Sequence, residues 1–271
     1  MPLTSPVINH LEIPVVRTLI AMLSLSLAGT PPGGDPPASG TEVLQRMHDA
    51  YAGKWYTTLT FVQKTTYPDA RVETWYEAAA IPGKLRIDVA PIDSMNTILF
   101  RSDSIYQYGQ GKITLARPMI HPLMVLGFDV YAQPVAESVA KLSSLGFDLS
   151  RVREDTWKGR KNWVVGTVSP DSLSREFWVD QERLVFTRMV QSAPRKSTPG
   201  KSDIAEIQFN EYEKLGGGWI AIQVAFYNNG ERVQTEQYAD VKADPVLEPG
   251  LFEPGEWTRP GWVGTAVNGE R

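Results

Sequence analysis

The sequence predicts a mainly β (α+β) fold, an antiparallel sheet of about 11–12 strands that is apolar on one face and has two short helices against it. Runs of alternating apolar and polar residues recur in both halves of the chain and are joined by turns. Only two segments have the periodicity of a helix. No segment after Arg151 could form a helix long enough to connect parallel strands, which excludes a doubly wound α/β fold.

The composition restricts how this protein can bind a ligand. The 271 residues have a net charge of -4 with both signs scattered along the chain, which argues against charge-driven binding of nucleic acid or anionic lipid. The absence of cysteine excludes disulfides, thiolate metal sites, cysteine nucleophiles and a lipid-modified cysteine. We therefore expect any ligand to be recognised by shape and apolar contact.

Residues 1–28 have the features of a secretory signal peptide. Arg17 precedes an apolar stretch that ends in small residues, and cleavage is expected near Ala28. The alternative is a membrane anchor, but the apolar stretch has only about half of the roughly 20 residues that a span needs. Residues 29–40 are rich in proline and glycine and are expected to form a linker.

The folded domain is expected over residues 41–254, and its first helix over residues 39–53. Ser39 and Glu42 have the spacing of a capping box, and Gly53 can end the helix in a left-handed conformation. The apolar residues of this helix share one face, so we expect the helix to dock on the sheet.

Five short strands are expected between residues 55 and 108. In the central one, Leu85, Ile87 and Val89 alternate with three charged residues, which is typical of a strand with one buried and one solvated face. In the first strand, Leu59 and Phe61 lie on the same side. The five strands form a meander whose apolar face must be covered.

An apolar loop is expected over residues 117–127, because Pro118 and Pro122 argue against a simple helix there. A second helix is expected after it, with Val139 and Leu142 on one face. Two interpretations of this region remain open: the loop and helix form a lid over a ligand, or they close one end of the core.

The chain returns to strands and turns after Arg151. About seven more antiparallel strands are expected up to residue 243, with a polar, mobile tip over residues 193–202. Residues 255–271 are expected to form a C-terminal tail in which a few aromatic residues pack locally.

The sequence contains no arrangement typical of an enzyme, and we expect no catalysis, cofactor or metal. Its three histidines are badly placed for a metal site, and the common phosphate-binding and nucleophile motifs are absent. Several carboxylates could pair across strands as a hydrolase dyad, but they lie on the polar sides of their strands, where we expect solvent. These carboxylates are Glu73, Glu77, Asp88, Glu154 and Asp155.

Tryptophans in the predicted strands leave one further alternative. Exposed aromatic side chains stack on sugars or lie at the depth of lipid headgroups, although tryptophans in strands are usually core residues. Trp75 is the exception to follow, because it shares its side of the strand with Glu73 and Glu77.

Five motifs occur in an order that resembles the LolA/LolB-like group of periplasmic lipoprotein-sorting proteins. They follow a secretory leader and a first helix, and the matching order extends over residues 40–254. The motifs are TFVQK (60–64), IPGKLRID (81–88), SDSIYQY (102–108), FWVD (177–180) and LFEP (251–254).

The resemblance implies a strongly curved antiparallel sheet that forms an incomplete β-barrel, with helices on its concave side and an apolar cavity between them. Two short helices do not fill a curved sheet of about twelve strands, so the residue pattern also predicts leftover apolar space. Four features depart from the family pattern. One is Trp75-Tyr76 on the strand before Ile81, where relatives usually have a small residue. The usual Asp-Gly step is Ser102-Asp103-Ser104, no arginine matches the one that latches the carrier's lid, and the lack of cysteine rules out a lipid-anchored receptor of the LolB type.

We therefore expect a monomeric, soluble periplasmic protein that holds lipid or lipoprotein acyl chains without covalent attachment, and that exchanges them with other envelope proteins. The alternative is an envelope sensor or interaction module of the same fold that binds a protein partner. A third class, a hydrolase, would need two carboxylates that converge in a cleft with shifted pKa values. The residues expected to line the cavity are Leu59, Phe61, Leu85, Ile87, Val89, Ile98, Phe100, Met119, Leu123, Met124, Leu126, Val139 and Leu142.

Overall fold

The computed structural model of the protein describes residues 35–168, 175–194 and 202–264. The chain divides into two units, residues 1–36 and residues 37–271, and every described helix and strand belongs to the second unit. The predicted signal peptide and the last residues of the tail lie outside the described residues. Within the described ranges, no helix is long and apolar enough to cross a membrane.

The second unit is mainly β and contains three short α-helices and thirteen strands in its described part. The helices are α1 (Gly40–Tyr51), α2 (Pro122–Gly127) and α3 (Val135–Ser144). The strands of the first half are β1 (Thr58–Thr66), β2 (Val72–Ala80), β3 (Lys84–Val89), β4 (Asn96–Arg101), β5 (Ser104–Gly109) and β6 (Lys112–Pro118). Those of the second half are β7 (Val152–Trp157), β8 (Arg160–Val165), β9 (Glu176–Asp180), β10 (Phe186–Pro194), β11 (Ser202–Leu215), β12 (Gly218–Asn228) and β13 (Glu231–Ala243).

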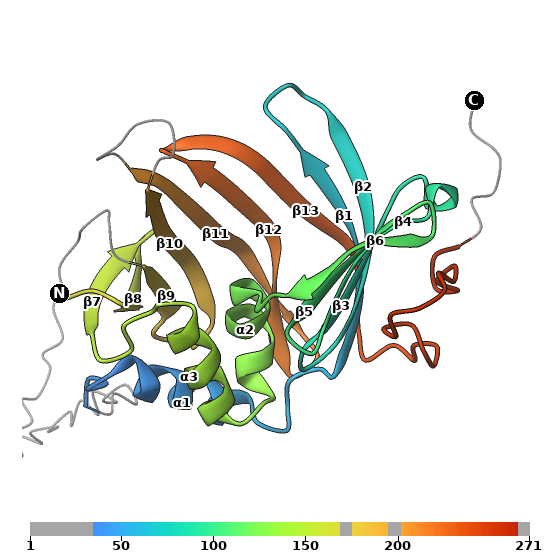
Figure 1. Ribbon diagram of the computed structural model, residues 1–271. Helices are drawn as coiled ribbons and strands as arrows, with labels where there is room; N and C mark the ends of the chain where they lie inside the picture. Colours follow the sequence, from blue (N-terminus) through green and yellow to red (C-terminus); the bar gives the residue numbers. More distant parts are fainter. Residues whose placement is uncertain (1–34, 169–174, 195–201, 265–271) are drawn as a thin grey trace, which may run out of the picture. The chain divides into compact units, whose positions relative to one another are not determined.

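All thirteen strands form one antiparallel sheet with the order β6-β5-β4-β3-β2-β1-β13-β12-β11-β10-β9-β8-β7. Each half of the chain forms a meander, and the two meanders join where β1 pairs with β13. The sheet is strongly curved (Figure 1). It does not close, and β6 and β7 remain as its two edges. Register shifts in four strand pairs mark bulges, which increase twist and bend a sheet.

The three helices lie on the concave side of the sheet (Figure 1). Two of them, α2 and α3, belong to the segment that leads from edge strand β6 to edge strand β7. A chain that must pass from one edge of a curved sheet to the other crosses its open side. The fold therefore places the predicted apolar loop and second helix over the concave face.

The first helix has the cap that its sequence predicts. The Glu42 backbone N–H donates to Ser39 Oγ at 3.3 Å, and the Ala38 N–H donates to Glu42 Oε2 at 2.9 Å. Val43, Leu44 and Met47 are completely buried, so the apolar face of α1 docks as expected.

Two elements were not expected from the sequence. The strand β6 lies at the edge of the sheet and is almost entirely exposed, so burial imposes no clear pattern on its residues. The expected loop over residues 117–127 contains the short helix α2. Pro122 occupies a first-turn position of α2, where the missing N–H of proline is not needed for an intrahelical hydrogen bond.

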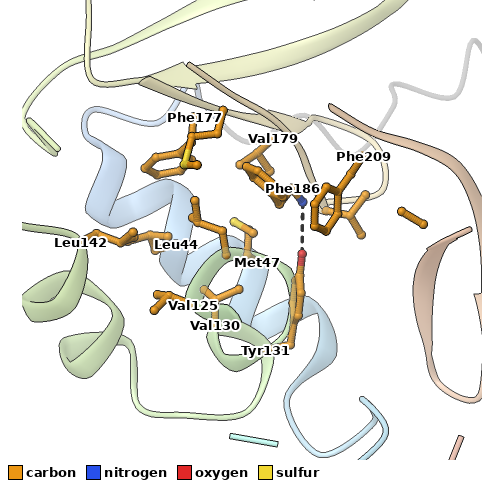
Figure 2. Packing of buried hydrophobic residues seen from close by; sticks show 14 of the residues in the cluster. Leu44, Met47, Val125, Val130, Tyr131, Leu142, Phe177, Val179, Phe186 and Phe209 are labelled. Carbon is orange, nitrogen blue, oxygen red and sulfur yellow. Dashed lines mark hydrogen bonds between the residues drawn. The ribbon is translucent and has the colours of Figure 1, made fainter. Parts of the chain in front are cut away.

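The helices fill one part of the concave side. Leu44 and Met47 of α1 and Leu142 of α3 pack with Phe177 of β9 and Phe186 of β10 in the main core (Figure 2). The Phe186 backbone N–H donates to the Tyr131 hydroxyl at 3.2 Å, which ties the segment between α2 and α3 to the sheet (Figure 2).

The outer face of β2 to β5 is covered as well, which contradicts the expectation that charged residues of these strands face solvent. Segments after β13 place Leu251, Phe252 and Trp257 against Ala78 and Tyr108. Beneath them lies a buried ion pair in which the guanidinium of Arg86 contacts the carboxylate of Asp88 at 2.8 Å. Arg86 also donates to the carbonyl oxygens of Leu251 and Thr258, at 3.2 and 2.7 Å. These strands are therefore buried on both faces.

Candidate functional site

The candidate site is an apolar pocket on the concave side of the sheet, with a cavity volume of about 270 Å³. This is close to the lower end of the range for small-molecule sites, roughly 300–1,000 Å³. The sheet supplies most of its wall, and the α2 region supplies the rest. The apolar lining comprises Phe61, Trp75, Leu85, Ile87, Ile98, Phe100, Ile105, Leu123, Met124, Phe128, Phe209, Val224 and Phe226.

Strand alternation explains why these side chains meet. On β3, Leu85 and Ile87 point into the concave side, whereas Arg86 points to the outer face and its ion pair. On β4, Ile98 and Phe100 point the same way, since Ile87 and Ile98 are direct partners across the two strands. Neighbouring strands therefore present a continuous apolar surface.

Seven of the thirteen residues predicted to line a cavity line this pocket, namely Phe61, Leu85, Ile87, Ile98, Phe100, Leu123 and Met124. Met119 lies beside it, in a small cleft of about 10 Å³ that Phe100 and Met124 also line. The fold brings these eight side chains together from β1, β3, β4 and the connection around α2.

The other five predicted residues lie elsewhere. Leu59, Leu126 and Leu142 are completely buried and belong to the main core. Val139 packs against that core from α3, and the half-buried Val89 lies outside the pocket lining. The side chains of α3, and Leu126 of α2, therefore close the core, which is the second of the two interpretations of this region.

The sequence pattern did not reveal the polar part of the lining, which consists of Gln63, Glu77, His121, Gln234, Glu236 and Tyr238. On β13, the alternate positions of Gln234, Glu236 and Tyr238 resemble the solvated side of a strand. The sequence signal that could have found them is the shared side of Trp75 and Glu77 on β2. Trp75 does line the pocket, and its Nε1–H donates to Glu73 at 3.0 Å.

Glu77 is not solvated, contrary to the expectation for the polar side of its strand. Its side chain is 4% exposed, and it has no hydrogen-bond or ion-pair partner within the described part of the chain. Burial raises the pKa of Glu77 well above its ordinary value, and the nearby charge of Glu236 raises it further. The expectation fails because Ala78, not Glu77, points to the outer face beneath the C-terminal segment.

Glu236 is also buried, but it accepts hydrogen bonds. The Tyr238 hydroxyl donates to Glu236 Oε2 at 3.0 Å, and Gln234 Nε2 donates to Glu236 Oε1 at 2.7 Å. Burial raises the pKa of Glu236 to about 7, although these donors act in the opposite direction. Near neutral pH, the Glu236 carboxyl is therefore present in both its protonated and its ionised form.

His121 adds a third polar group from the segment just before α2. Burial lowers its pKa to about 4, so the imidazole is neutral at pH 7. The Nδ1 atom is buried and has no hydrogen-bond partner among the described residues. Its ring meets the Phe100 ring edge-on at 4.9 Å between centroids.

This arrangement suits an amphiphile better than a polar substrate. Gln63, Gln234 and Tyr238 donate to Thr65 and Glu236, so few polar groups of the lining remain for a sugar or a peptide. Among the described residues, no three histidine or acidic side chains group in a way that could hold a metal ion. The rest of the wall is apolar and suits a hydrocarbon chain.

The architecture and the pocket together define a LolA-like fold, an incomplete β-barrel with helices on its concave side. No family model matches the chain, and no curated protein does. Solved structures match it closely enough to confirm the predicted resemblance at the level of the fold.

Two of these structures have a TM-score of 0.50 and 14% sequence identity, and each match covers 79% of this chain and 96% of the other. One is a DUF1329 family protein from Desulfovibrio piger, and the other is a proposed outer membrane lipoprotein-sorting protein domain from Vibrio parahaemolyticus. A LolA superfamily protein from Nitrosomonas europaea has a TM-score of 0.48 and 10% identity, with 80% of this chain and 98% of the other covered. At these identities the likeness concerns the fold alone.

Proposed function

We propose that this protein is a periplasmic carrier that binds lipid or lipoprotein acyl chains non-covalently in the concave pocket. The observation that carries the proposal is the pocket itself, an apolar cavity of about 270 Å³ left open by the three helices. Each methylene group transferred from water into such a site contributes about 0.8 kcal/mol. A chain of moderate length therefore binds without a covalent bond.

The fold and the N-terminal sequence support the same proposal. A protein domain of this fold from Vibrio parahaemolyticus is described as a proposed outer membrane lipoprotein-sorting domain. The features of a signal peptide in residues 1–28 favour export, and we propose a soluble monomer that exchanges its ligand with other envelope proteins. Catalysis, a cofactor or a metal forms no part of the proposed function.

The pocket favours a carrier over an interaction module of the same fold. An interaction module would have a filled concave side and a large exposed apolar patch. In the described part of the chain, the large exposed apolar residues are Val72, Ile113, Val168, Val233 and Val246, and they are spread over several segments.

A matched pair of substitutions tests the carrier function. Ile98→Trp adds bulk inside the pocket, whereas Ile113→Trp makes the same change at an exposed position of edge strand β6. We expect mass spectrometry of organic extracts to detect lipid with natively purified wild-type protein and with Ile113→Trp. With Ile98→Trp, the lipid should be strongly reduced while circular dichroism remains that of the wild type.

Two outcomes would contradict the proposal. One is wild-type protein that carries no lipid and binds no added fatty acyl probe. The other is an Ile98→Trp variant that retains as much lipid as Ile113→Trp.

A further inference from the structure

The pocket contains two buried carboxyl groups, those of Glu77 and Glu236, which we call the acidic pair. Glu77 comes from β2 and Glu236 from β13, the strands on either side of β1. The two residues are 4% and 7% exposed. Both line the same pocket, and on the intervening strand β1 they lie opposite Phe61 and Thr65, respectively. The fold thus brings together two acids that are far apart in the sequence.

Among the described residues, no cation accompanies the acidic pair in the pocket lining. Neither lysine nor arginine is among the described residues that line the pocket. Glu236 accepts hydrogen bonds from the uncharged groups of Gln234 and Tyr238, and Glu77 has no partner in the described part of the chain. Buried carboxylates in proteins are normally paired with a cation, as Asp88 is with Arg86 on the outer face.

A second group of the pocket, the His121 ring, also lacks a donor among the described residues. His121 Nδ1 is buried without a partner, and on a neutral imidazole that donates through Nε2 this atom accepts a hydrogen bond. The unpartnered polar atoms of the lining therefore include a carboxyl group and a ring nitrogen. A ligand head that only donates hydrogen bonds and carries positive charge complements both.

We propose that the natural ligand of this pocket is a cationic amphiphile, whose hydrocarbon chain lies along the apolar wall and whose ammonium head is bound by Glu77 and Glu236. This inference rests on the proposed function and specifies the ligand class of the same site. An ammonium group supplies three N–H donors and the charge that the acidic pair lacks. A carboxylate head brings no charge that stabilises the ionised pair, and a neutral ester leaves the pair without a cation.

The proposal predicts how binding depends on pH. The titratable groups that line the pocket are Glu77 of β2, Glu236 and Tyr238 of β13, and His121 before α2. The pKa of Tyr238 is raised well above its ordinary value and that of His121 is about 4, so neither changes charge between pH 5 and 8. Burial raises the pKa of both acids, and an ammonium head reverses this effect by favouring the carboxylates. Binding of the amine therefore releases protons and strengthens as the pH rises.

The test compares three probes with the same chain: dodecylamine, laurate and methyl laurate. Isothermal titration calorimetry on the full chain, below the micellar concentration of each probe, gives the dissociation constants at pH 5.5 and pH 8. We expect dodecylamine at pH 8 to bind at least about tenfold more tightly than methyl laurate. Its affinity should fall about tenfold or more at pH 5.5, and that of laurate should not.

Variants test whether the preference for dodecylamine over methyl laurate depends on the acidic pair. Glu77→Gln and Glu236→Gln keep the shape of the side chain, remove the charge and should bring dodecylamine close to methyl laurate in affinity. Glu154→Gln makes the same change at an exposed position of edge strand β7 and should leave the preference intact. Methyl laurate binding by each variant reports that the pocket is still folded.

The outcomes separate this inference from the carrier function. If all three probes bind equally, if laurate or methyl laurate binds most tightly, or if both glutamine variants retain the amine preference, the inference fails and the carrier function stands. If none of the probes binds the wild-type protein, both fail.

Discussion

The buried acid Glu236 makes the stability of this protein depend on pH. Burial raises its pKa in the folded protein to about 7, from an ordinary value of 4.5 that we take for the unfolded chain. Between these values the folded state keeps a proton that the unfolded state releases. The contribution of Glu236 to stability is therefore complete below about pH 4.5 and is lost as the pH rises to 7.

The size of this loss follows from the two pKa values. Each pH unit between them corresponds to about 1.4 kcal/mol, so Glu236 should cost about 3 kcal/mol of unfolding free energy between pH 4.5 and pH 7. Its side chain is 7% exposed, so screening by solvent is small. Glu77 acts with the same sign, because its pKa is also raised by burial.

Urea denaturation of the wild type and of Glu236→Gln at several pH values measures this effect. Carboxyl groups far from Glu236 titrate alike in both proteins, so the difference between the two unfolding free energies reports Glu236 together with its effect on Glu77. We expect the variant to gain about 3 kcal/mol relative to the wild type from pH 4.5 to pH 7.5. A difference that stays constant within about 1 kcal/mol would refute a raised pKa for Glu236.

Two further predictions concern stability, and urea denaturation tests both. Arg86→Met leaves the Asp88 carboxylate buried without its cation and should cost about 3–5 kcal/mol, whereas Arg71→Met removes an exposed ion pair and should cost less than about 1 kcal/mol. Equal losses would contradict the burial of the pair. Ser39→Ala removes the N-cap of α1 and should cost about 1 kcal/mol, and Ser143→Ala, at an exposed position of α3, should be close to neutral. An unchanged stability of the Ser39 variant would contradict the cap.

The elements that the sequence predicted correctly are those with local signals. The α1 cap depends on Ser39 and Glu42, three residues apart, and the structure confirms it. The strands of the first meander carry alternating residues and short turns, and pairs such as Leu85 with Phe100 form as antiparallel neighbours. Local signals were weak for edge strand β6, where almost no residue is buried, and that strand was not predicted.

The residues of the pocket were predicted only in part, because the sequence carries local patterns and does not show which side chains meet in the fold. Alternation correctly grouped Leu85 with Ile87, and both line the pocket. The apolar periodicity of α3 and α2 could not distinguish pocket residues from core residues, and Leu142 and Leu126 belong to the core. A helical pattern states which side is buried, but not whether a side chain or a cavity lies opposite.

The sequence alone determined the class of this protein: a mainly antiparallel sheet with few helices and residues that resemble those of the LolA-like group. Only the tertiary structure decided which face of each strand borders the pocket. The segment after β13 covers the outer face of β2 and β3, so both faces are buried and residue polarity no longer distinguishes inside from outside. The residue pattern therefore did not show that Ala78 lies on the outer face and Glu77 in the pocket. Nor did it show that Glu77 of β2 shares the pocket with Glu236 of β13, two strands that are separated by β1.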